Sequence, residues 1–509
     1  MRKIILLILC FSCPLLYAQQ KFVVADVFTD HMVLQRDAKV KVWGKAESGK
    51  KVHLSINGQH KQAIVSDGKW ELTLAPMMHG GPYELKVWVD TDTLTFRDVL
   101  LGDVWLAGGQ SNLEWPMRRV KDAASQIAQA DFPEIRYYKA PRKFYASHMV
   151  GEETWRVCSP QTASEFSAIA YYFARNIHRE IGVPVGIIQC PVGGTTAEAW
   201  MSRELLLSDK KHRPIVENYD SIMASYGNRY ETVYKEWENR KTAYDRAVRE
   251  KKQTGVSPAE PMGEKNFRRP IGLHENMLKP LAPYTLKGFL FYQGESNTGR
   301  GVQYETLFPA MIKEWRAIWK QGDIPFLFIQ LPRFNTKSRE WAELRDAQYR
   351  TSRNVKNCGM AVAYDQGNPK DIHPWVKDTV GWRISSVALG KVYHKQQIYS
   401  GPELKKCSVK GSDVTLTFTH VGSGLIAKDG ASKIRGFMVA GKDGRFYLAE
   451  ATIVNNRTVK LAATGVSAPV YVRYAWTNSM EINLFNKEGF PAVPFRTDKF
   501  RLTSEGIWK

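Results

Sequence analysis

The sequence has only six cysteines in 509 residues, too few for a fold that depends on a disulfide framework. Its glycines and prolines follow no period, which excludes collagen-like and low-complexity proteins. It also lacks a long Lys/Arg block and the Cys/His spacing of a zinc module, so nothing specific indicates nucleic acid. With 43% hydrophobic and 24% charged residues, the composition is that of a globular protein of about three domains.

The charge of the chain is strongly positive. Lys and Arg number 72 and Asp and Glu 51, which gives a formal net charge of +21. Such a field favours anionic partners. Because the basic residues are spread along the chain, we interpret the charge as a general surface property with a bias toward acidic substrates.

The first 18 residues resemble a secretory signal peptide. Arg2 and Lys3 precede an apolar stretch that ends in small residues at Ala18. The stretch is short for the ~20 residues of a membrane span, and Pro14 interrupts it. We therefore expect cleavage near Ala18, a secreted or periplasmic protein, and a mature charge of +21 − 2 = +19. The sequence leaves open how the remaining cysteines pair: Cys158, Cys190, Cys358 and Cys407.

Hydrophobic periodicity divides the rest of the chain into three parts. Residues 19–101 alternate apolar and polar positions between turns, which predicts an N-terminal β-sandwich. Residues 102–395 alternate apolar strands with amphipathic helices, which predicts an α/β domain with a parallel sheet flanked by helices. A polar helical insertion interrupts it at about 204–265. Residues 396–509 return to alternation and predict a C-terminal antiparallel β module.

Three polar clusters directly follow predicted strands of the middle part, where α/β sheets form their sites. They are Gly109-Gln110-Ser111-Asn112, Gly193-Gly194-Thr195 and Tyr292-Gln293-Gly294-Glu295-Ser296-Asn297. A serine just past a strand can act as a nucleophile, although Leu113 excludes the Gly-x-Ser-x-Gly elbow. Glycine amides and an amide side chain can stabilise an oxyanion. Taken alone, the first two clusters are better explained as a turn or a helix cap.

A fourth cluster, Asp371-Ile372-His373-Pro374, supplies a histidine. Side chains two residues apart in an extended segment share a face. Asp371 could therefore orient the ring of His373 while the other ring nitrogen takes a proton from Ser111. The four clusters together are much more specific than any one of them.

These motifs resemble the SGNH-type hydrolases and, within them, the sialate O-acetylesterase family. Segments near the C-terminus share the likeness: Tyr474-Ala475-Trp476, Asn483-Leu484-Phe485-Asn486 and Gly489-Phe490-Pro491. The resemblance implies an SGNH-like sheet, Ser111 as nucleophile and His373 as base, with no cofactor and no metal. It also implies oxyanion donors from the Ser111 amide, the Gly193-Gly194 pair, and Gln293 or Asn297.

The sequence departs from the family pattern in two places. The acid that the superfamily carries three residues before its histidine is replaced by Lys370, so Asp371 or a backbone carbonyl would orient His373. In the third cluster Gln293 precedes Gly294, and we expect it, ahead of Asn297, to donate to the oxyanion.

Substrate contacts are less constrained by the sequence. Glu295 either braces its loop or contacts substrate, and Arg300 and Arg333 are candidates for a substrate carboxylate, with surface solvation as the alternative. The resemblance implies a secreted carbohydrate O-acetylesterase acting on O-acetylated sialic acid. Two alternatives are an acetylesterase on plant polysaccharide such as xylan and an inactive glycan-binding protein. We expect no nucleic-acid partner and no membrane span; the oligomeric state is open.

Overall fold

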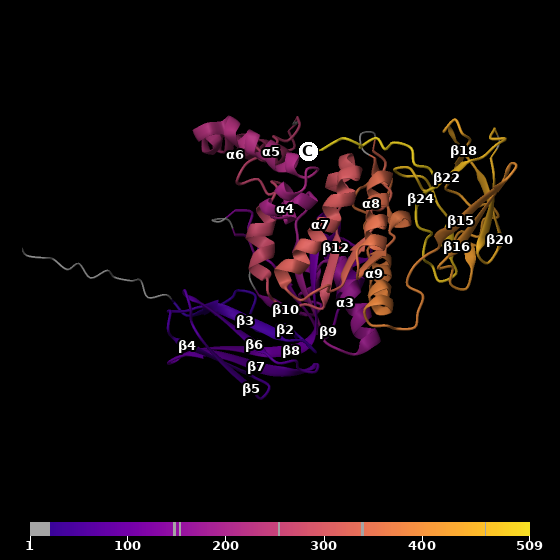
Figure 1. The fold of residues 1–509 in the computed structure, drawn as a ribbon. Helices are drawn as coiled ribbons and strands as arrows, with labels where there is room; N and C mark the ends of the chain where they lie inside the picture. Colours follow the sequence, from indigo (N-terminus) through magenta and orange to yellow (C-terminus); the bar gives the residue numbers. More distant parts are fainter. Residues whose placement is uncertain are drawn as a thin grey trace, which may run out of the picture.

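The computed structural model describes residues 21–145, 149–151, 154–252, 255–336, 340–463 and 465–508. The predicted signal peptide lies outside these residues. A β-rich N-terminal part lies below a central α/β part, and a second β-rich part lies beside it (Figure 1). The predicted α/β class with additional antiparallel β sheets is confirmed.

The N-terminal part is built from strands whose side chains alternate between buried and exposed, as the period of two predicts. One sheet has the order β1-β3-β6, and β4 pairs with β5 and β7 in the other. The strands are β1 (Val23–Val24), β2 (Val33–Gln35), β3 (Val40–Lys45), β4 (Lys51–Ile56), β5 (Gln59–Ile64), β6 (Lys69–Leu74) and β7 (Gly80–Val89).

Strand β8 (Asp92–Gly109) belongs to both the N-terminal part and the central sheet. Its first half pairs antiparallel with β7, and its second half pairs parallel with two strands of the central sheet. The boundary predicted between residues 101 and 102 therefore falls inside one continuous strand. From Val99 onward the strand is buried on both faces, which is typical of a central strand in a parallel sheet.

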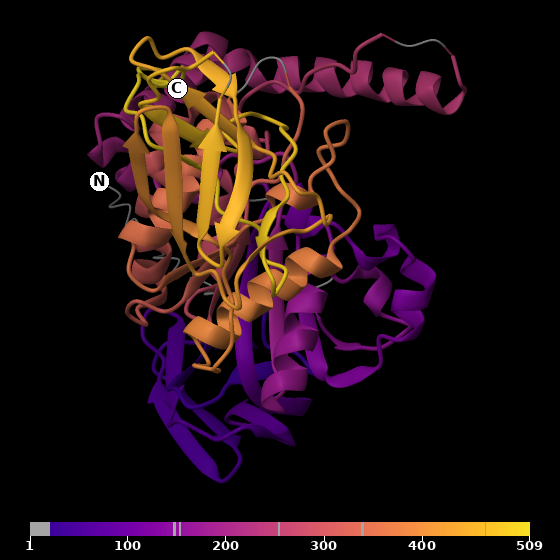
Figure 2. The ribbon, with the colours of Figure 1, turned by 90° about the vertical axis from the view of Figure 1, so that its right-hand side faces the viewer.

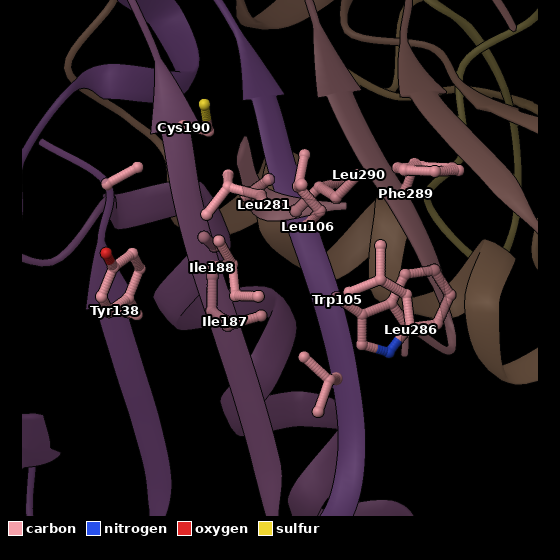
Figure 3. Close-up of a cluster of buried hydrophobic side chains, with 14 of the residues drawn as sticks. Trp105, Leu106, Tyr138, Ile187, Ile188, Cys190, Leu281, Leu286, Phe289 and Leu290 are labelled. Atoms are coloured by element: carbon pink, nitrogen blue, oxygen red, sulfur yellow. The ribbon is translucent and has the colours of Figure 1, made fainter. Parts of the chain in front are cut away.

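The central sheet contains the order β10-β9-β11-β8-β12-β13-β14. All neighbours pair parallel except β10 and β9, which pair antiparallel. The strands are β9 (Phe132–Lys139), β10 (Trp155–Cys158), β11 (Val185–Pro191), β12 (Gly288–Tyr292), β13 (Phe326–Ile329) and β14 (Cys358–Ala361). Apolar side chains such as Trp105, Ile187 and Phe289 fill the space beside these strands (Figure 3).

Helices cover both faces of this sheet. Trp105 packs edge-on against Phe173 of α3, whereas a side chain at Gly108, on the opposite face, would meet Trp315 of α7. Helix α9 packs against α3, and α8 packs against α7. These helices are α3 (Ala168–Ile181), α7 (Gly301–Trp319), α8 (Trp341–Asn354) and α9 (Asp378–Lys391); the short α1 (Ser111–Glu114) and α2 (Ala123–Ala128) follow β8.

The polar segment expected to be helical contains α4 (Arg203–Ser208), α5 (Arg213–Tyr226) and α6 (Tyr230–Arg249). Helix α6 extends away from the body of the molecule (Figure 2). The loop that follows it returns to the central part, where the guanidinium of Arg268 would lie 3.4 Å from a side chain placed at Gly194. The segment just after the insertion therefore contributes a cation near the second polar cluster, Gly193-Gly194-Thr195.

The C-terminal part has a core of its own, centred on residues such as Leu416, Phe437 and Tyr474. Arg383 of α9 joins it to the central part: it forms a buried ion pair with Asp365 and also donates to the carbonyl of Gly489. The strands are β15 (Glu403–Lys410), β16 (Asp413–Thr419), β17 (Leu425–Ala427), β18 (Phe437–Ala440), β19 (Phe446–Leu448), β20 (Glu450–Asn455), β21 (Thr458–Ala462), β22 (Tyr471–Tyr474), β23 (Leu484–Asn486) and β24 (Phe495–Arg496).

The cysteines among the described residues are free thiols. Three of them are buried, and burial raises the pKa of Cys158 and of Cys190 to about 12. None of the described helices has the length and apolar character that crossing a membrane requires.

Candidate active site

The register of the central sheet brings the first three polar clusters together. Gly109 at the end of β8 lies between Pro191 of β11 and Tyr292 of β12. Gly109 has φ of +128°, and a Cβ there would lie 2.2 Å from the carbonyl oxygen of Tyr292. Only glycine fits this close approach of two backbones, and it lets the chain turn directly into α1.

Ser111 and His373 meet at this edge of the sheet although 262 positions separate them in the sequence. Ser111 is the first residue of α1, and His373 lies in the loop between β14 and α9. The distance from Ser111 Oγ to His373 Nε2 is 2.8 Å, which is a hydrogen bond. The hydroxyl is thus placed to donate its proton to the imidazole.

The ring of His373 is held by packing. Trp115 stacks on it, with centroids 5.5 Å apart and planes 21° from parallel. Burial is the main cause that lowers the pKa of His373, and the charges of Lys377 and Arg119 lower it further, while Asp371 opposes them. The neutral form, the one that can act as a base, is therefore favoured.

The predicted contact between Asp371 and the ring of His373 is not formed. The Asp371 carboxylate instead accepts from the backbone N–H of His373 at 2.8 Å. No acceptor for Nδ1 of His373 is found in the part of the chain that the structure describes, neither a carboxylate nor a carbonyl. A two-residue spacing here closes a tight turn, which directs the carboxylate to the backbone.

The backbone amides near Ser111 that have no acceptor among the described residues include those of Ser111 itself and of Gly194. The third expected donor, the N–H of Gly193, donates to Oε2 of Glu114 at 2.8 Å. Arg142 in turn pairs with the Glu114 carboxylate. A substrate oxyanion would have to displace Glu114 in order to use the Gly193 amide.

The amide side chains of the third cluster do not face Ser111. Gln293 donates to the carbonyl of Thr195 at 3.1 Å and to Asn297 Oδ1 at 2.7 Å, which uses both of its N–H groups. Asn297 donates to Glu198 Oε2 at 2.9 Å. The expectation that either one donates to an oxyanion is not met, because burial commits these amides to neighbouring loops.

Glu295 has the bracing position that was one of its two predicted roles. Its Oε1 accepts from Nδ2 of Asn112 at 2.6 Å, and its side chain is buried. Burial raises the pKa of Glu295 despite this hydrogen bond. The contact joins the third cluster to the first.

The two arginines that were candidates for a substrate carboxylate lie elsewhere. Arg300 forms an ion pair with Glu198 and donates to Gln303. Arg333 donates to the carbonyl of Gly367 at 3.3 Å. Neither lines the cavity at Ser111.

That cavity has a volume of about 360 Å³ and contains side chains that the sequence analysis missed. Four cations and two carboxylates line it: Arg118, Arg119, Lys139, Arg142, Glu114 and Glu165. Trp115 and Glu114 follow Ser111 by four and three residues, the helical spacing that would have indicated the same face. Among the described residues no cluster of three or more His, Cys, Asp or Glu side chains could hold a metal ion.

A serine and a histidine in contact beyond the ends of parallel strands are the arrangement of an ester hydrolase. The sequence and the fold agree with known enzymes of this class. A family model described as carbohydrate esterase, sialic acid-specific acetylesterase, matches residues 230–396. A crystal structure of a carbohydrate acetylesterase from Xanthomonas citri has 32% sequence identity and a TM-score of 0.76, covering 94% of this chain and 100% of that one.

The sialate O-acetylesterases of Mus musculus and Homo sapiens are 26% and 24% identical to this chain. Both matches cover 89% of this chain, with 89% of the mouse and 87% of the human protein. The chain is therefore a carbohydrate esterase. It belongs to the sialic acid-specific acetylesterase family, and the predicted family and enzyme class are confirmed.

Proposed function

We propose that this esterase removes O-acetyl groups from sialic acid by a serine acyl-enzyme mechanism. The contact between Ser111 Oγ and His373 Nε2 carries the mechanistic part of the proposal. Ser111 attacks the carbonyl carbon of the acetyl ester while His373 takes the serine proton. The C–O bond to the sugar then breaks, and the imidazolium returns its proton to the departing sugar oxygen.

Water completes the cycle. His373 removes a proton from water as the water oxygen attacks the acetyl-enzyme. The imidazolium then returns that proton to the Ser111 oxygen, and acetic acid leaves and ionises to acetate in solution. The backbone N–H groups of Ser111 and Gly194 are the donors we assign to the oxyanion in both steps. The Gly193 amide would join them once Glu114 moves away.

The charge around the cavity supports an acidic sugar. Four cationic side chains and two carboxylates line it, so the pocket carries an excess of two positive charges. A carboxylate-bearing sugar is attracted to such a cleft, whereas a neutral polysaccharide gains nothing from it. The names of the matched family and of the animal relatives agree with this substrate.

Export is part of the same proposal. The charged, apolar and small-residue segments before residue 19 support cleavage near Ala18 and release outside the cytoplasm. N-terminal sequencing of the protein recovered from the periplasm or the medium tests it, and an intact Met1 in that material would contradict it.

Acetate release by wild-type protein and Ser111→Ala tests the mechanism. Loss of the nucleophile should lower kcat by about 10³-fold or more on O-acetylated sialic acid. Ser125→Ala, in an exposed part of α2, is the matched control and should keep full activity. Wild-type turnover by Ser111→Ala would refute the serine route, and equal rates on acetylated sialic acid and acetylated xylan would leave the sialate preference unsupported.

A further inference from the structure

A chain of buried polar side chains lies directly behind Ser111 and His373. Lys377 donates from Nζ to Asn112 Oδ1 at 2.6 Å. Asn112 in turn donates from Nδ2 to Glu295 Oε1 at 2.6 Å and to the carbonyl of Ile372 at 3.1 Å. Asn112, the residue after Ser111, is thus hydrogen-bonded to residues on both sides of His373 in the sequence, Ile372 and Lys377.

Lys377 is unusually placed for a lysine. It is 2% exposed, and it stands at the N-cap position of α9, where the partial positive charge of a helix N-terminus disfavours a cation. A serine, aspartate or asparagine would cap the helix better. Lys377 thus departs from the usual capping preference at a buried position beside Ser111 and His373, and such departures typically have a functional reason.

The ammonium group has two partners among the described residues. One is Asn112, and the other is the ring of Trp115, whose centroid lies 5.4 Å from Nζ. Trp115 also stacks on His373. Lys377 therefore contacts Asn112, the neighbour of Ser111, and Trp115, the aromatic ring that stacks on His373.

We propose that Lys377 is a positioning residue of this site, which fixes Asn112 and Trp115 and thereby keeps Ser111 and His373 within proton-transfer distance. The proposal rests on Ser111 and His373 being the catalytic pair. Lys377, at the N-cap of α9, links the segment that carries Ser111 to the loop that carries His373. Neither Ser111 nor His373 can hold these two segments together by itself.

The charge of Lys377 also acts on His373. The groups that face these two side chains are Glu295 from the third cluster, Asp371 from their own loop and Arg119 from the segment after α1. Burial lowers the pKa of Lys377 to about 7, so the ammonium form predominates in the acidic range where histidine titrates. A positive charge there disfavours a second one on the imidazole.

Lys377→Met tests the proposal because methionine keeps the length of the stem and removes the ammonium. Loss of a hydrogen bond to a charged group should lower kcat by about 10- to 100-fold, with a smaller change in KM. Without the neighbouring charge the pKa of His373 rises, so the acid limb of kcat/KM should move to higher pH. A lysine that only stabilised the fold would not move that limb.

Two further variants complete the experiment. Lys377→Gln keeps a donor for Asn112 without the charge, so it should retain more kcat than Met but show the same shift of the acid limb. Lys391→Met removes a lysine at the other end of α9, where Nζ donates to the carbonyl of Cys358, and should leave the pH profile unchanged. Melting temperatures identify variants that have lost their fold.

The outcomes separate this proposal from the proposed mechanism. If kcat of Lys377→Met equals that of wild type, Lys377 does not position the pair. Two measurements together would refute the charge effect. The acid limb of kcat/KM would stay in place in both variants at position 377, and titration of the histidine C2 protons would show an unchanged pKa for His373. A fully active Ser111→Ala would instead refute the serine mechanism itself.

Discussion

Replacing Arg119 by alanine should weaken turnover of an acidic acetylated sugar and spare a neutral one. Arg119 lines the cavity at Ser111, and its guanidinium lies 5.5 Å from the centroid of Trp115. Among the described residues no carboxylate forms an ion pair with it. The neighbouring Arg118 already pairs with Glu165. Arg119 is therefore the cation of this cavity with the most attraction left for a substrate carboxylate.

The expected loss of activity in Arg119→Ala follows from the solvent exposure of the Arg119 side chain. Arg119 is exposed, so an ion pair with a substrate carboxylate is worth about 1 kcal/mol, the upper end for solvated pairs. That corresponds to about a 5-fold loss in kcat/KM. Arg118→Ala is the matched control and should cost less than about 2-fold, because its charge is already neutralised by Glu165.

The assay is acetate release from O-acetylated sialic acid and from its carboxyl methyl ester, with wild type and Arg119→Ala. The methyl ester removes the substrate charge, so the four rates form a double-mutant cycle. Arg119→Ala should lose about 5-fold on the free acid and almost nothing on the ester, and the difference should shrink at high salt. Equal losses on both substrates would refute the assignment of Arg119 to the carboxylate.

Three other properties can be tested on the same protein. Because burial and the Lys377 charge lower the pKa of His373, the base stays neutral to lower pH, and the acid limb of kcat/KM should lie below the ordinary value of about 6.5; a limb above it would contradict the predicted shift. Gly193→Ala would place a methyl group 3.3 Å from Cβ of Ser111, so kcat should fall by about 10- to 100-fold while the melting temperature stays near wild type. Arg383→Met would remove the buried partner of Asp365 and leave its carboxylate with the half-exposed Lys428 at 3.5 Å. The free energy of unfolding should fall by about 3 kcal/mol, measured as a lower urea midpoint; an unchanged midpoint would mean that the Arg383–Asp365 pair contributes no net stability.

The place of Ser111 in the site could be predicted from the sequence because it depends on where a strand ends, whereas His373, in the loop between β14 and α9, was predicted from the Asp371-Ile372-His373 spacing and the family resemblance. Polar residues that follow parallel strands gather at one edge of a sheet, whatever their separation along the chain. The α/β class followed from the same alternation of apolar strands and amphipathic helices. These features depend on periodicity, which a single sequence displays.

The direction of individual side chains could not be predicted. Gln293 has the right chemistry for an oxyanion donor, but its amide turns to Thr195 and Asn297 instead. Lys377 lies four residues after His373, where the sequence suggests no more than the start of a helix. Its role depends on contacts with Asn112 and Trp115 from the first cluster, which no pattern in the sequence brings near it.

The continuity of β8 constrains how this enzyme can be rearranged. The strand that begins as a hairpin arm at Asp92 ends at Gly109, two residues before Ser111, without a linker between the two parts. A chimera that exchanged the N-terminal module at residue 101 would cut through a hydrogen-bonded ladder in which Leu100 and Leu101 pair with β2. The N-terminal module and the α/β part therefore share one strand, and an exchange at residue 101 would break the pairing of that strand with β2.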